Sequence, residues 1–337
     1  MKGIIKIKKI THRITEEISA TNKIASETSV KDAVTTFIAK IDIQRSVRNG
    51  YKETPAVKRR LLKKHKVMFE YFDKTFADFS DSYDYNRPLA VDDERNRNHI
   101  WVCWWQGLEQ APEIVKICIE SIRRNVKNHE VTLITDENYS EYVHIPSWVE
   151  QKRDKGIISK THFADLLRLS LLAEHGGMWL DATFFCTSPE IEEYFTYPVW
   201  SVKRPDYLHL SVASGNFANF SLACDYDHRW VFATFRDFFL HYWKTNNSLI
   251  DYLTLDYLIV LAQRKDERIK ELFDAIVPNN RKCDNLYIAL PQIYDERYWN
   301  SLKEDTALFK LSWKIDYPKL IHGNETFYGK LLNRDLF

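Results

Sequence analysis

The middle of the chain alternates between two hydrophobic patterns. Residues 99–105 (HIWVCWW) and 129–135 (HEVTLIT) are short apolar runs of the kind that form buried β-strands. Between them, residues 111–125 carry apolar side chains at three- and four-residue spacing, which predicts an α-helix. Strand, helix and strand in this order predict a parallel βαβ unit. We therefore expect an α/β fold whose ligand site lies beyond the carboxyl ends of the strands.

The pattern continues with further helices and another strand. A short helix is expected near residues 147–154 and a long one over 161–174, followed by a strand in MWLDATFF at 178–185. Gly176 and Gly177 separate the long helix from that strand, and paired glycines are typical of an abrupt helix end. This order allows a helix end and a strand end to converge.

The beginning of the chain has a different pattern of apolar and charged residues. Residues 31–47 and 55–76 show helical spacing of apolar residues with basic residues between them, and an acidic, polar stretch follows at 80–98. We therefore expect a basic helical appendage with its linker over residues 1–97, and the α/β domain over residues 98–337.

Composition narrows the class of protein. With 337 residues, 45% hydrophobic and 14% aromatic, the chain is expected to fold around a large core. Its five cysteines are scattered without a C-x-x-C pair, which favours reduced thiols over disulfides or a zinc site. The start has no apolar core of signal-peptide length, and no stretch approaches the roughly 18 apolar residues of a spanning helix. These features predict a cytoplasmic protein.

The net charge of +1 hides an uneven distribution. Residues 1–75 contain 18 Lys and Arg against 8 Asp and Glu, whereas the rest of the chain contains 30 against 39. The basic segment is interpreted either as a solvated face packed on the main domain or as a surface attracted to the anionic inner face of a membrane. In the second case each nearby Lys or Arg contributes about 1 kcal/mol. Nucleic acid is not expected as a partner, because aromatic residues are not interleaved with the basic ones.

The chemistry concentrates in residues 162–183 (HFADLLRLSLLAEHGGMWLDAT). Asp165 and Arg168 are neighbours three residues apart on the long apolar helix, and the following strand delivers Asp181, with Thr183 on the same face. This combination suits a charged, hydroxyl-rich ligand, although the helix pair is also explained by a simple ion pair. Motifs for NAD binding, a P-loop, zincins and α/β-hydrolases are absent from the sequence.

The stretch FADLLRLSLLAEHGGMWLDAT resembles the signature of DXD-containing sugar transferases of glycosyltransferase family 32 type, especially bacterial capsular polysaccharide synthesis proteins. IWVCWWQG at 100–107 and FKLSWK at 309–314 extend the resemblance, which covers about residues 98 to 330 and leaves the appendage outside. It implies a GT-A fold, that is, a Rossmann-like mixed sheet flanked by helices, here with a helical N-terminal appendage. It also implies a nucleotide-sugar donor, usually with Mn²⁺ or Mg²⁺, and an acceptor hydroxyl.

The resemblance assigns roles to individual residues. Asp165 and Arg168 would hold hydroxyls of the donor sugar, and Asp181, the first acid of the DXD motif, would lie between ribose, sugar and metal. Lys160 and Arg168 would stabilise the departing diphosphate. The residues expected to bind the nucleotide sugar are Trp104, Trp105, Gln106, Lys160, Asp165, Arg168, Gly177 and Asp181.

The metal site is the weakest part of the resemblance. Thr183 stands where the second acid of the motif is expected, and Ala164 stands where a serine is common. Because hard divalent cations prefer anionic oxygen ligands, one carboxylate fewer should weaken metal binding. The expected ligands are Asp181, Thr183 and His322, and His322 also has a purely structural interpretation.

Asp256 is the expected acid on the acceptor side, since Asp251, Leu255 and Asp256 lie on a mostly apolar helix that can face the cleft; a capping or surface carboxylate is the alternative. The resemblance implies a retaining transfer, from a UDP-sugar, to a saccharide or lipid-linked saccharide in capsule or exopolysaccharide synthesis. It places the protein in the cytoplasm, peripheral to the inner membrane face. Two alternatives remain: a protein-modifying glycosyltransferase, and a sugar-nucleotide-binding protein that has lost catalysis.

Overall fold

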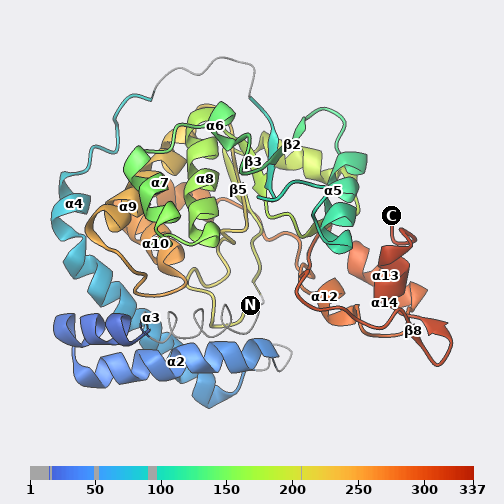
Figure 1. The fold of residues 1–337 in the computed structure, drawn as a ribbon, viewed down its shortest axis with the longest axis horizontal. Coiled ribbons are helices and arrows are strands. Elements are labelled where there is room, and N and C mark those ends of the chain that lie inside the picture. The colour runs from blue at the N-terminus through green and yellow to red at the C-terminus, as the bar shows by residue number, and fades with distance from the viewer. Residues whose placement is uncertain (1–14, 16, 49–52, 90–96, 206) are drawn as a thin grey trace.

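A five-stranded mixed sheet lies at the centre of the fold (Figure 1). The structure is a computed structural model that describes residues 15, 17–48, 53–89, 97–205 and 207–337. The strands follow the order β2-β1-β3-β6-β5, in which β1 is parallel to β2 and β3, whereas β6 is antiparallel to β3 and β5. Their bounds are Ile100–Cys103 (β1), Val131–Ile134 (β2), Gly177–Leu180 (β3), Val199–Ser201 (β5) and Ser221–Cys224 (β6).

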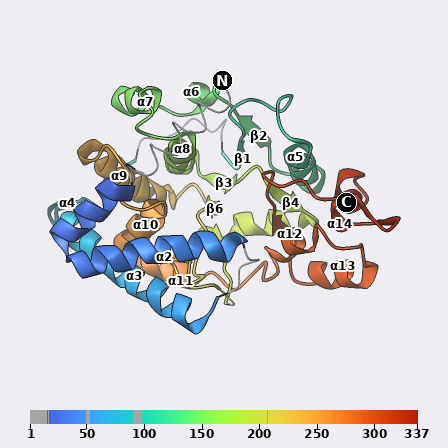
Figure 2. The ribbon, with the colours of Figure 1, turned by 60° about the horizontal axis from the view of Figure 1, so that its bottom comes forward.

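The predicted βαβ unit is confirmed. Helix α5 (Glu113–Asn125) connects β1 to β2, and α8 (Lys160–His175) precedes β3. Because β2 and β3 lie on opposite sides of β1, the connections diverge at the carboxyl ends of β1 and β3, which is where open α/β sheets form a crevice. Figure 2 shows α8 and α5 on opposite sides of these strands. Two short helices, α6 (Tyr139–Tyr142) and α7 (Ser147–Asp154), lie between β2 and α8.

The single strand predicted over residues 178–185 is wrong. The chain forms β3, turns through residues 181–183, and begins a second strand, β4 (Phe184–Cys186), which pairs antiparallel with β7 (Leu308–Lys310) in a separate sheet. The turn closes when the Phe184 amide donates to the Asp181 carbonyl at 3.0 Å. At the polar Asp-Ala-Thr sequence the chain thus passes from the five-stranded sheet to the sheet of β4 and β7.

Helices cover the rest of the sheet. Helix α9 (Arg229–Thr245) packs along α8, and α10 (Thr254–Lys265) packs against α9 and is followed by α11 (Glu267–Asp274). The C-terminal region consists of α12 (Asn285–Ala289), α13 (Glu296–Lys303), β8 (Leu320–Ile321), β9 (Asn324–Glu325) and α14 (Phe327–Leu332). A short 3₁₀ helix, η2 (Pro189–Thr196), lies between β4 and β5.

The helices predicted near the start of the chain are confirmed as α2 (Val30–Arg48) and α3 (Pro55–Thr75), followed by α4 (Ala77–Ser82). Thr54 caps α3, since its hydroxyl accepts from the Val57 amide, and Pro55 occupies the first turn, where no amide donor is needed. Apolar residues of α3 continue the main core across to α10. None of the described helices is long and apolar enough to span a membrane.

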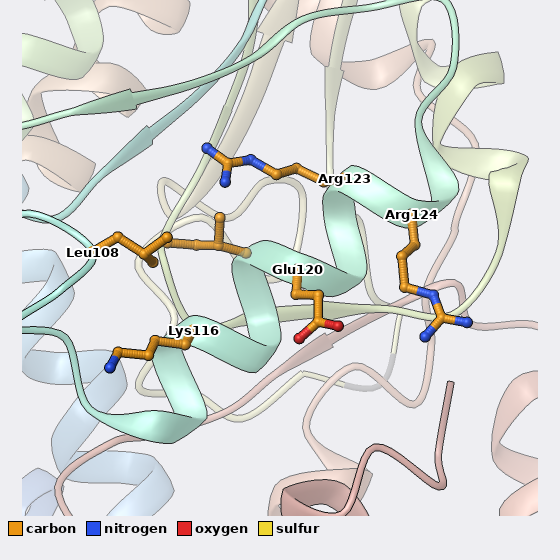
Figure 3. Close-up of a pocket in the computed structure, with 6 residues that line it drawn as sticks. Leu108, Lys116, Glu120, Arg123 and Arg124 are labelled. Carbon is orange, nitrogen blue, oxygen red and sulfur yellow. The ribbon is translucent and has the colours of Figure 1, made fainter.

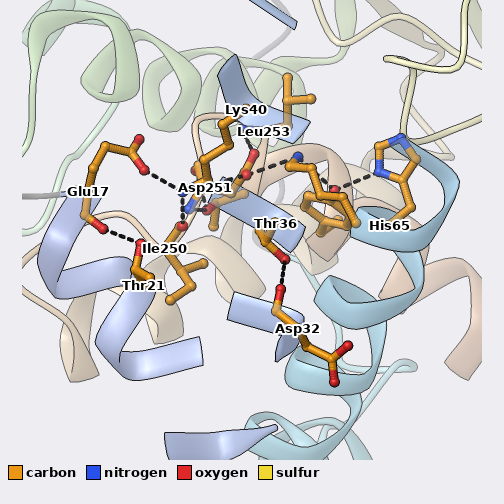
Figure 4. Close-up of polar contacts among 12 residues, drawn as sticks. Glu17, Thr21, Asp32, Thr36, Lys40, His65, Ile250, Asp251 and Leu253 are labelled. Atoms are coloured by element: carbon orange, nitrogen blue, oxygen red, sulfur yellow. Dashed lines mark hydrogen bonds and ion pairs between the residues drawn. The ribbon is translucent and has the colours of Figure 1, made fainter. Parts of the chain in front are cut away.

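Several basic residues of these helices are used internally (Figure 4). Lys64 is fully buried, and its ammonium lies 2.9 Å from the carboxylate of Asp251, which Lys40 approaches at 3.9 Å. Burial alone would raise the pKa of Asp251, but these two ammonium groups hold it below its usual value. The expectation that Asp251 turns toward the cleft is therefore wrong, because its carboxylate joins the N-terminal helices to the segment before α10.

Candidate functional site

Helix α8 carries two charged residues in an almost entirely buried setting. Ser159 begins the helix by accepting the His162 amide at 3.3 Å, and Gly176, at φ 72°, ends it. Asp165 is 8% exposed and Arg168 5% exposed, and an Arg168 Nη2 lies 3.1 Å from Asp165 Oδ1. Burial raises the pKa of Asp165, and the guanidinium opposes that shift. The predicted pair is therefore an ion pair. Whether it also belongs to a ligand site depends on the residues around it.

Asp181 extends this pair at the carboxyl edge of the sheet. It directly follows β3, and its Oδ1 lies 3.5 Å from Arg168 Nη2 and accepts a hydrogen bond from Trp179 Nε1 at 3.1 Å. The Arg168 guanidinium also lies over the Trp179 ring, 5.1 Å from its centroid. The Asp181 side chain is 32% exposed, whereas that of Asp165 is 12% exposed. Asp181 is thus the accessible end of the Asp165–Arg168–Asp181 cluster.

Lys310 joins the cluster from β7, which sequence reasoning did not anticipate. Its ammonium donates to Thr183 Oγ1 at 2.6 Å and lies 3.4 Å from Asp181 Oδ2. The pairing of β4 with β7, in which Phe184 opposes Lys310, brings it there. FKLSWK was already noted as part of the resemblance, but nothing local in it reveals a strand partner more than a hundred residues away.

Asn219 connects the cluster to α10. Its backbone carbonyl accepts a hydrogen bond from Arg168 Nη1, and its side-chain amide donates to Asp256 Oδ2 at 2.8 Å. The structure thus brings the predicted Asp256 to the same place, in the first turn of α10. Burial, together with the negative charge of Asp165, raises the pKa of Asp256 to about 7. A carboxyl group that titrates near neutrality is suited to exchanging a proton or a hydrogen bond with a substrate hydroxyl.

Two rings border the acidic side of the cluster. His162 Nδ1 lies 3.3 Å from Asp165 Oδ2, and the His162 ring packs against Tyr252 with 5.5 Å between centroids. Tyr252 is 70% exposed, which is unusual for so large a ring and leaves one face open to solvent beside the site. Neither residue was predicted as part of the site. His162 stands three residues before Asp165 on the predicted helix, a spacing that indicates such a contact, whereas nothing in the segment of Tyr252 does.

The two tryptophans that follow β1 reach the same edge of the sheet and are both partly buried, but their indole nitrogens differ in hydrogen bonding. Trp105 packs on Phe163, 5.4 Å between centroids, and its Nε1 donates to the Lys160 carbonyl at 3.2 Å, so this ring is held by the fold. Trp104 meets Trp313 edge to face at 5.5 Å, and within the described chain its Nε1 has no hydrogen-bond partner. This nitrogen is buried, so it is not presented to a ligand in this conformation.

Gln106 and Lys160 are exposed at this edge, and Lys160 forms an ion pair with Asp136. Gly177 is not brought to the cluster, because it begins β3 whereas Asp181 follows its last residue. A Cβ at Gly177 would lie 2.4 Å from the His99 carbonyl oxygen, and its φ is +84°. Its role is therefore the close approach of β3 to β1 rather than contact with a ligand.

His322 also lies apart from the cluster. It occupies the turn between β8 and β9, where it is exposed and has a positive φ of 49°. Figure 1 shows β8 at the right of the molecule and β3 at its centre. The three expected metal ligands are therefore not gathered in one place.

The residues around Asp181 do not fit a divalent cation. The described residues contain no group of three or more His, Cys, Asp or Glu arranged to hold a metal. Asp181 Oδ1 faces Trp179 and Arg168, while Oδ2 and the Thr183 hydroxyl face the Lys310 ammonium. A hard dication needs several free oxygen ligands, and here those oxygens already face positive or donor groups.

A separate surface hollow lies on α5 (Figure 3). It is lined by Leu108, Lys116, Ile119, Glu120, Arg123 and Arg124, none of which belongs to the cluster. Arg334 lies 2.8 Å from Glu120 at this face. The titratable residues with specific partners at the sheet edge, rather than this hollow, define the candidate site.

Comparison with known proteins gives one match. The profile of a family described as Capsular polysaccharide synthesis protein matches residues 48–331, which is most of the chain. No curated protein and no solved structure matches the chain. The match begins just before α3, so the expected limit of similarity near residue 98 was too far along the chain.

Proposed function

The chain belongs to the capsular polysaccharide synthesis protein family, and we propose that it is a glycosyltransferase with a GT-A-type donor site. Family membership suggests a role in capsule synthesis. The reaction proposed is transfer of a sugar from a nucleotide sugar, a UDP-sugar first of all, to a saccharide hydroxyl. The observation that carries the proposal is the convergence of Asp165, Arg168 and Asp181 at the carboxyl ends of β1 and β3.

The cluster has the chemistry that a donor sugar requires. Carboxylates accept hydrogen bonds from vicinal hydroxyls, and a guanidinium donates to hydroxyl or phosphate oxygens. Asp165 and Arg168 are fixed by burial and by each other, so their polar atoms are held in place before a ligand arrives. Trp104, which follows β1 at the same edge of the sheet, is proposed to flank the nucleotide base.

Transfer breaks the bond between the anomeric carbon and the diphosphate oxygen and forms a bond to the acceptor oxygen. The acceptor hydroxyl would pass its proton to the Asp256 carboxylate, and negative charge develops on the leaving diphosphate. Arg168 would stabilise that charge, aided by Lys160 at the start of α8. Asp256 would accept a hydrogen bond from the acceptor hydroxyl, with Tyr252 offering a flat ring for the acceptor sugar. The retaining outcome rests on the family resemblance.

The acceptor is proposed to be a saccharide or a lipid-linked saccharide, used while the protein lies peripherally on the inner face of a membrane. The support for membrane contact is the basic excess of residues 1–75. Burial of Lys40 and Lys64 in internal pairs reduces the charge available for that contact. Sedimentation with anionic vesicles, compared with a variant in which the exposed Lys58, Arg59 and Lys66 of α3 are replaced by glutamine, tests this part separately.

The decisive experiment is a donor screen. Purified protein is incubated with a panel of UDP- and GDP-sugars, with and without acceptor saccharides, and release of nucleotide is measured. We expect release from at least one donor, lost in Asp181→Ala and unchanged in Lys116→Met, whose side chain lies on α5 away from the site. Donor binding without release would favour a binding protein that has lost catalysis. Neither binding nor release from any donor would overturn the proposed function.

A further inference from the structure

Lys310 lies between the two side chains that stand at the acidic positions of the DXD pattern, Asp181 and Thr183. Its ammonium lies between the carboxylate of Asp181, at 3.4 Å, and the hydroxyl of Thr183, at 2.6 Å. It reaches this place from β7, past the rings of Phe184 and Phe220, at 5.9 and 5.6 Å from their centroids. The side chain is 22% exposed, so it remains open to a ligand at the sheet edge.

The positions of the two cations, rather than the net charge of the cluster, favour a ligand that is an anion over a metal. The Asp165 and Asp181 carboxylates face two cations, Arg168 and Lys310, and Asp256 is half protonated near pH 7. An added dication would have to lie beside both cations. An added diphosphate would instead find a guanidinium and an ammonium converging on one edge of the sheet.

Thr183 supports the role of Lys310 as a cation that is open to a ligand. Its hydroxyl accepts from Lys310 and positions the ammonium without neutralising it, whereas an aspartate there would form a second full ion pair. The departure from the DXD pattern and the presence of Lys310 are therefore two parts of one feature. Because β4 and β7 are paired at Phe184 and Lys310, the fold sets the distance between them.

We propose that Lys310 binds the donor diphosphate in place of a divalent cation, so that sugar transfer by this protein needs no added metal. The inference rests on the proposed glycosyltransferase function. In the transfer step the ammonium remains protonated and stabilises the negative charge that the diphosphate gains as the anomeric bond breaks. Lys310 would therefore be a catalytic residue that touches the leaving group.

Binding measurements separate this role from a structural one. The affinities of UDP and uridine are measured by calorimetry in EDTA for the wild type, Lys310→Met, Lys310→Arg and the control Lys116→Met; GDP and guanosine replace them if the donor screen selects GDP-sugars. Losing a charge-assisted contact should weaken UDP binding by about ten- to a hundredfold and leave uridine binding unchanged. Lys310→Arg should keep most of the difference in affinity between UDP and uridine. If UDP and uridine weaken equally in Lys310→Met, Lys310 is structural and the proposal is overturned.

Activity supplies the second test. Wild-type donor turnover in EDTA should lie within about twofold of that in Mn²⁺ or Mg²⁺. The double variant Thr183→Asp/Lys310→Met adds one carboxylate and frees that of Asp181 from the ammonium, and it should bind UDP more tightly with Mn²⁺ than with EDTA. Wild-type activity that EDTA abolishes and Mn²⁺ restores would overturn this inference and leave the proposed function standing. Failure of every nucleotide to bind would overturn both.

Discussion

Two buried ion-pair clusters in this molecule look alike in composition but differ in what surrounds them. Lys64 and Asp251 pair between α3 and the segment before α10, with side chains only 0% and 3% exposed. The Asp165–Arg168–Asp181 cluster instead ends in a side chain that is 32% exposed, at the edge of the sheet. The Lys64–Asp251 pair is itself closed to solvent and reaches the surface through Lys40 and Glu17, whose side chain is 43% exposed. The second cluster opens at the carboxyl edge of the central sheet, where α/β sheets bind ligands.

The two clusters are alike in how completely their polar atoms are used. Arg168 contacts two carboxylates and the Asn219 carbonyl, and Lys64 contacts Asp251 and the Tyr257 hydroxyl, at 3.1 Å. Among the described residues each cluster also has one buried polar atom without a hydrogen-bond partner, Arg168 Nε in one and Asp251 Oδ2 in the other. A buried ion pair alone therefore does not identify a site. Convergence of several elements at the carboxyl edge of the sheet, together with an exposed member, does.

The largest expected effect is on the open cluster. Asp181→Ala should lower donor turnover by about 10³-fold or more, because it removes the accessible carboxylate that faces Arg168 and Lys310. Its melting temperature should change little, since the side chain is partly exposed. Single-turnover rates and thermal unfolding of the same preparation check this, and a variant with full turnover would show that the site lies elsewhere.

The closed cluster should respond in stability instead. Lys64→Met leaves the Asp251 carboxylate buried with only the more distant Lys40, which should cost about 3 kcal/mol of unfolding free energy. Lys63→Met on the same helix, an exposed pair with Asp32, should cost less than about 1 kcal/mol. Urea unfolding measures both. A Lys64→Met protein as stable as the wild type would remove the distinction between the clusters.

Arg168→Lys tests the geometry of the open cluster without changing its charge. One ammonium cannot reach Asp165, Asp181 and the Asn219 carbonyl together, whereas the guanidinium contacts all three. We expect a decrease in kcat/KM of about ten- to a hundredfold, smaller than that of Asp181→Ala. Equal activity of the lysine variant would mean that charge alone matters at this position.

The smallest effect expected is a pH dependence carried by Asp256. Its pKa of about 7 means that the carboxylate able to accept an acceptor hydroxyl is lost as the pH falls below 7. The rate should therefore decrease about tenfold per pH unit below 7, and Asp256→Asn should remove this limb at the cost of a lower plateau.

The raised pKa of Asp256 also fixes the direction in which the stability of the folded protein changes with pH. The folded protein holds this proton more tightly than the unfolded chain does. The protonated carboxyl therefore contributes to the free energy of unfolding below pH 3.8, and this contribution is lost as the pH rises through 7. Asp256→Asn should thus be no less stable than the wild type at pH 8. A wild-type rate that is flat from pH 5 to 8 would remove Asp256 from the reaction.

Local pattern predicts the elements that carry the open cluster, since α5, α8 and strands β1 and β2 follow from spacing and from the glycine pair after α8. The charged pair on α8 is visible in sequence because three-residue spacing fixes which side chains meet. The break between β3 and β4 is not visible, because an apolar run that crosses from one sheet to another looks like one long strand.

The partners from distant segments are equally hidden. Lys310 and Asn219 reach the cluster through strand pairing and loop packing, which depend on the whole fold. Asp251 was misplaced for a related reason: helical spacing placed it beside Asp256, but α10 begins only at Thr254. Asp251 therefore lies in the segment before the helix, where its carboxylate pairs with Lys64.

The turn at residues 181–183 has a consequence for how the protein is made. It is fixed on one side by the Asp181 amide, which donates to the Phe220 carbonyl, and on the other by the Leu311 amide, which donates to the Thr183 carbonyl. The second of these hydrogen bonds, and the Lys310 side chain, come from residues synthesised more than a hundred positions after the turn. The site therefore cannot be completed on the ribosome before β7 has been made.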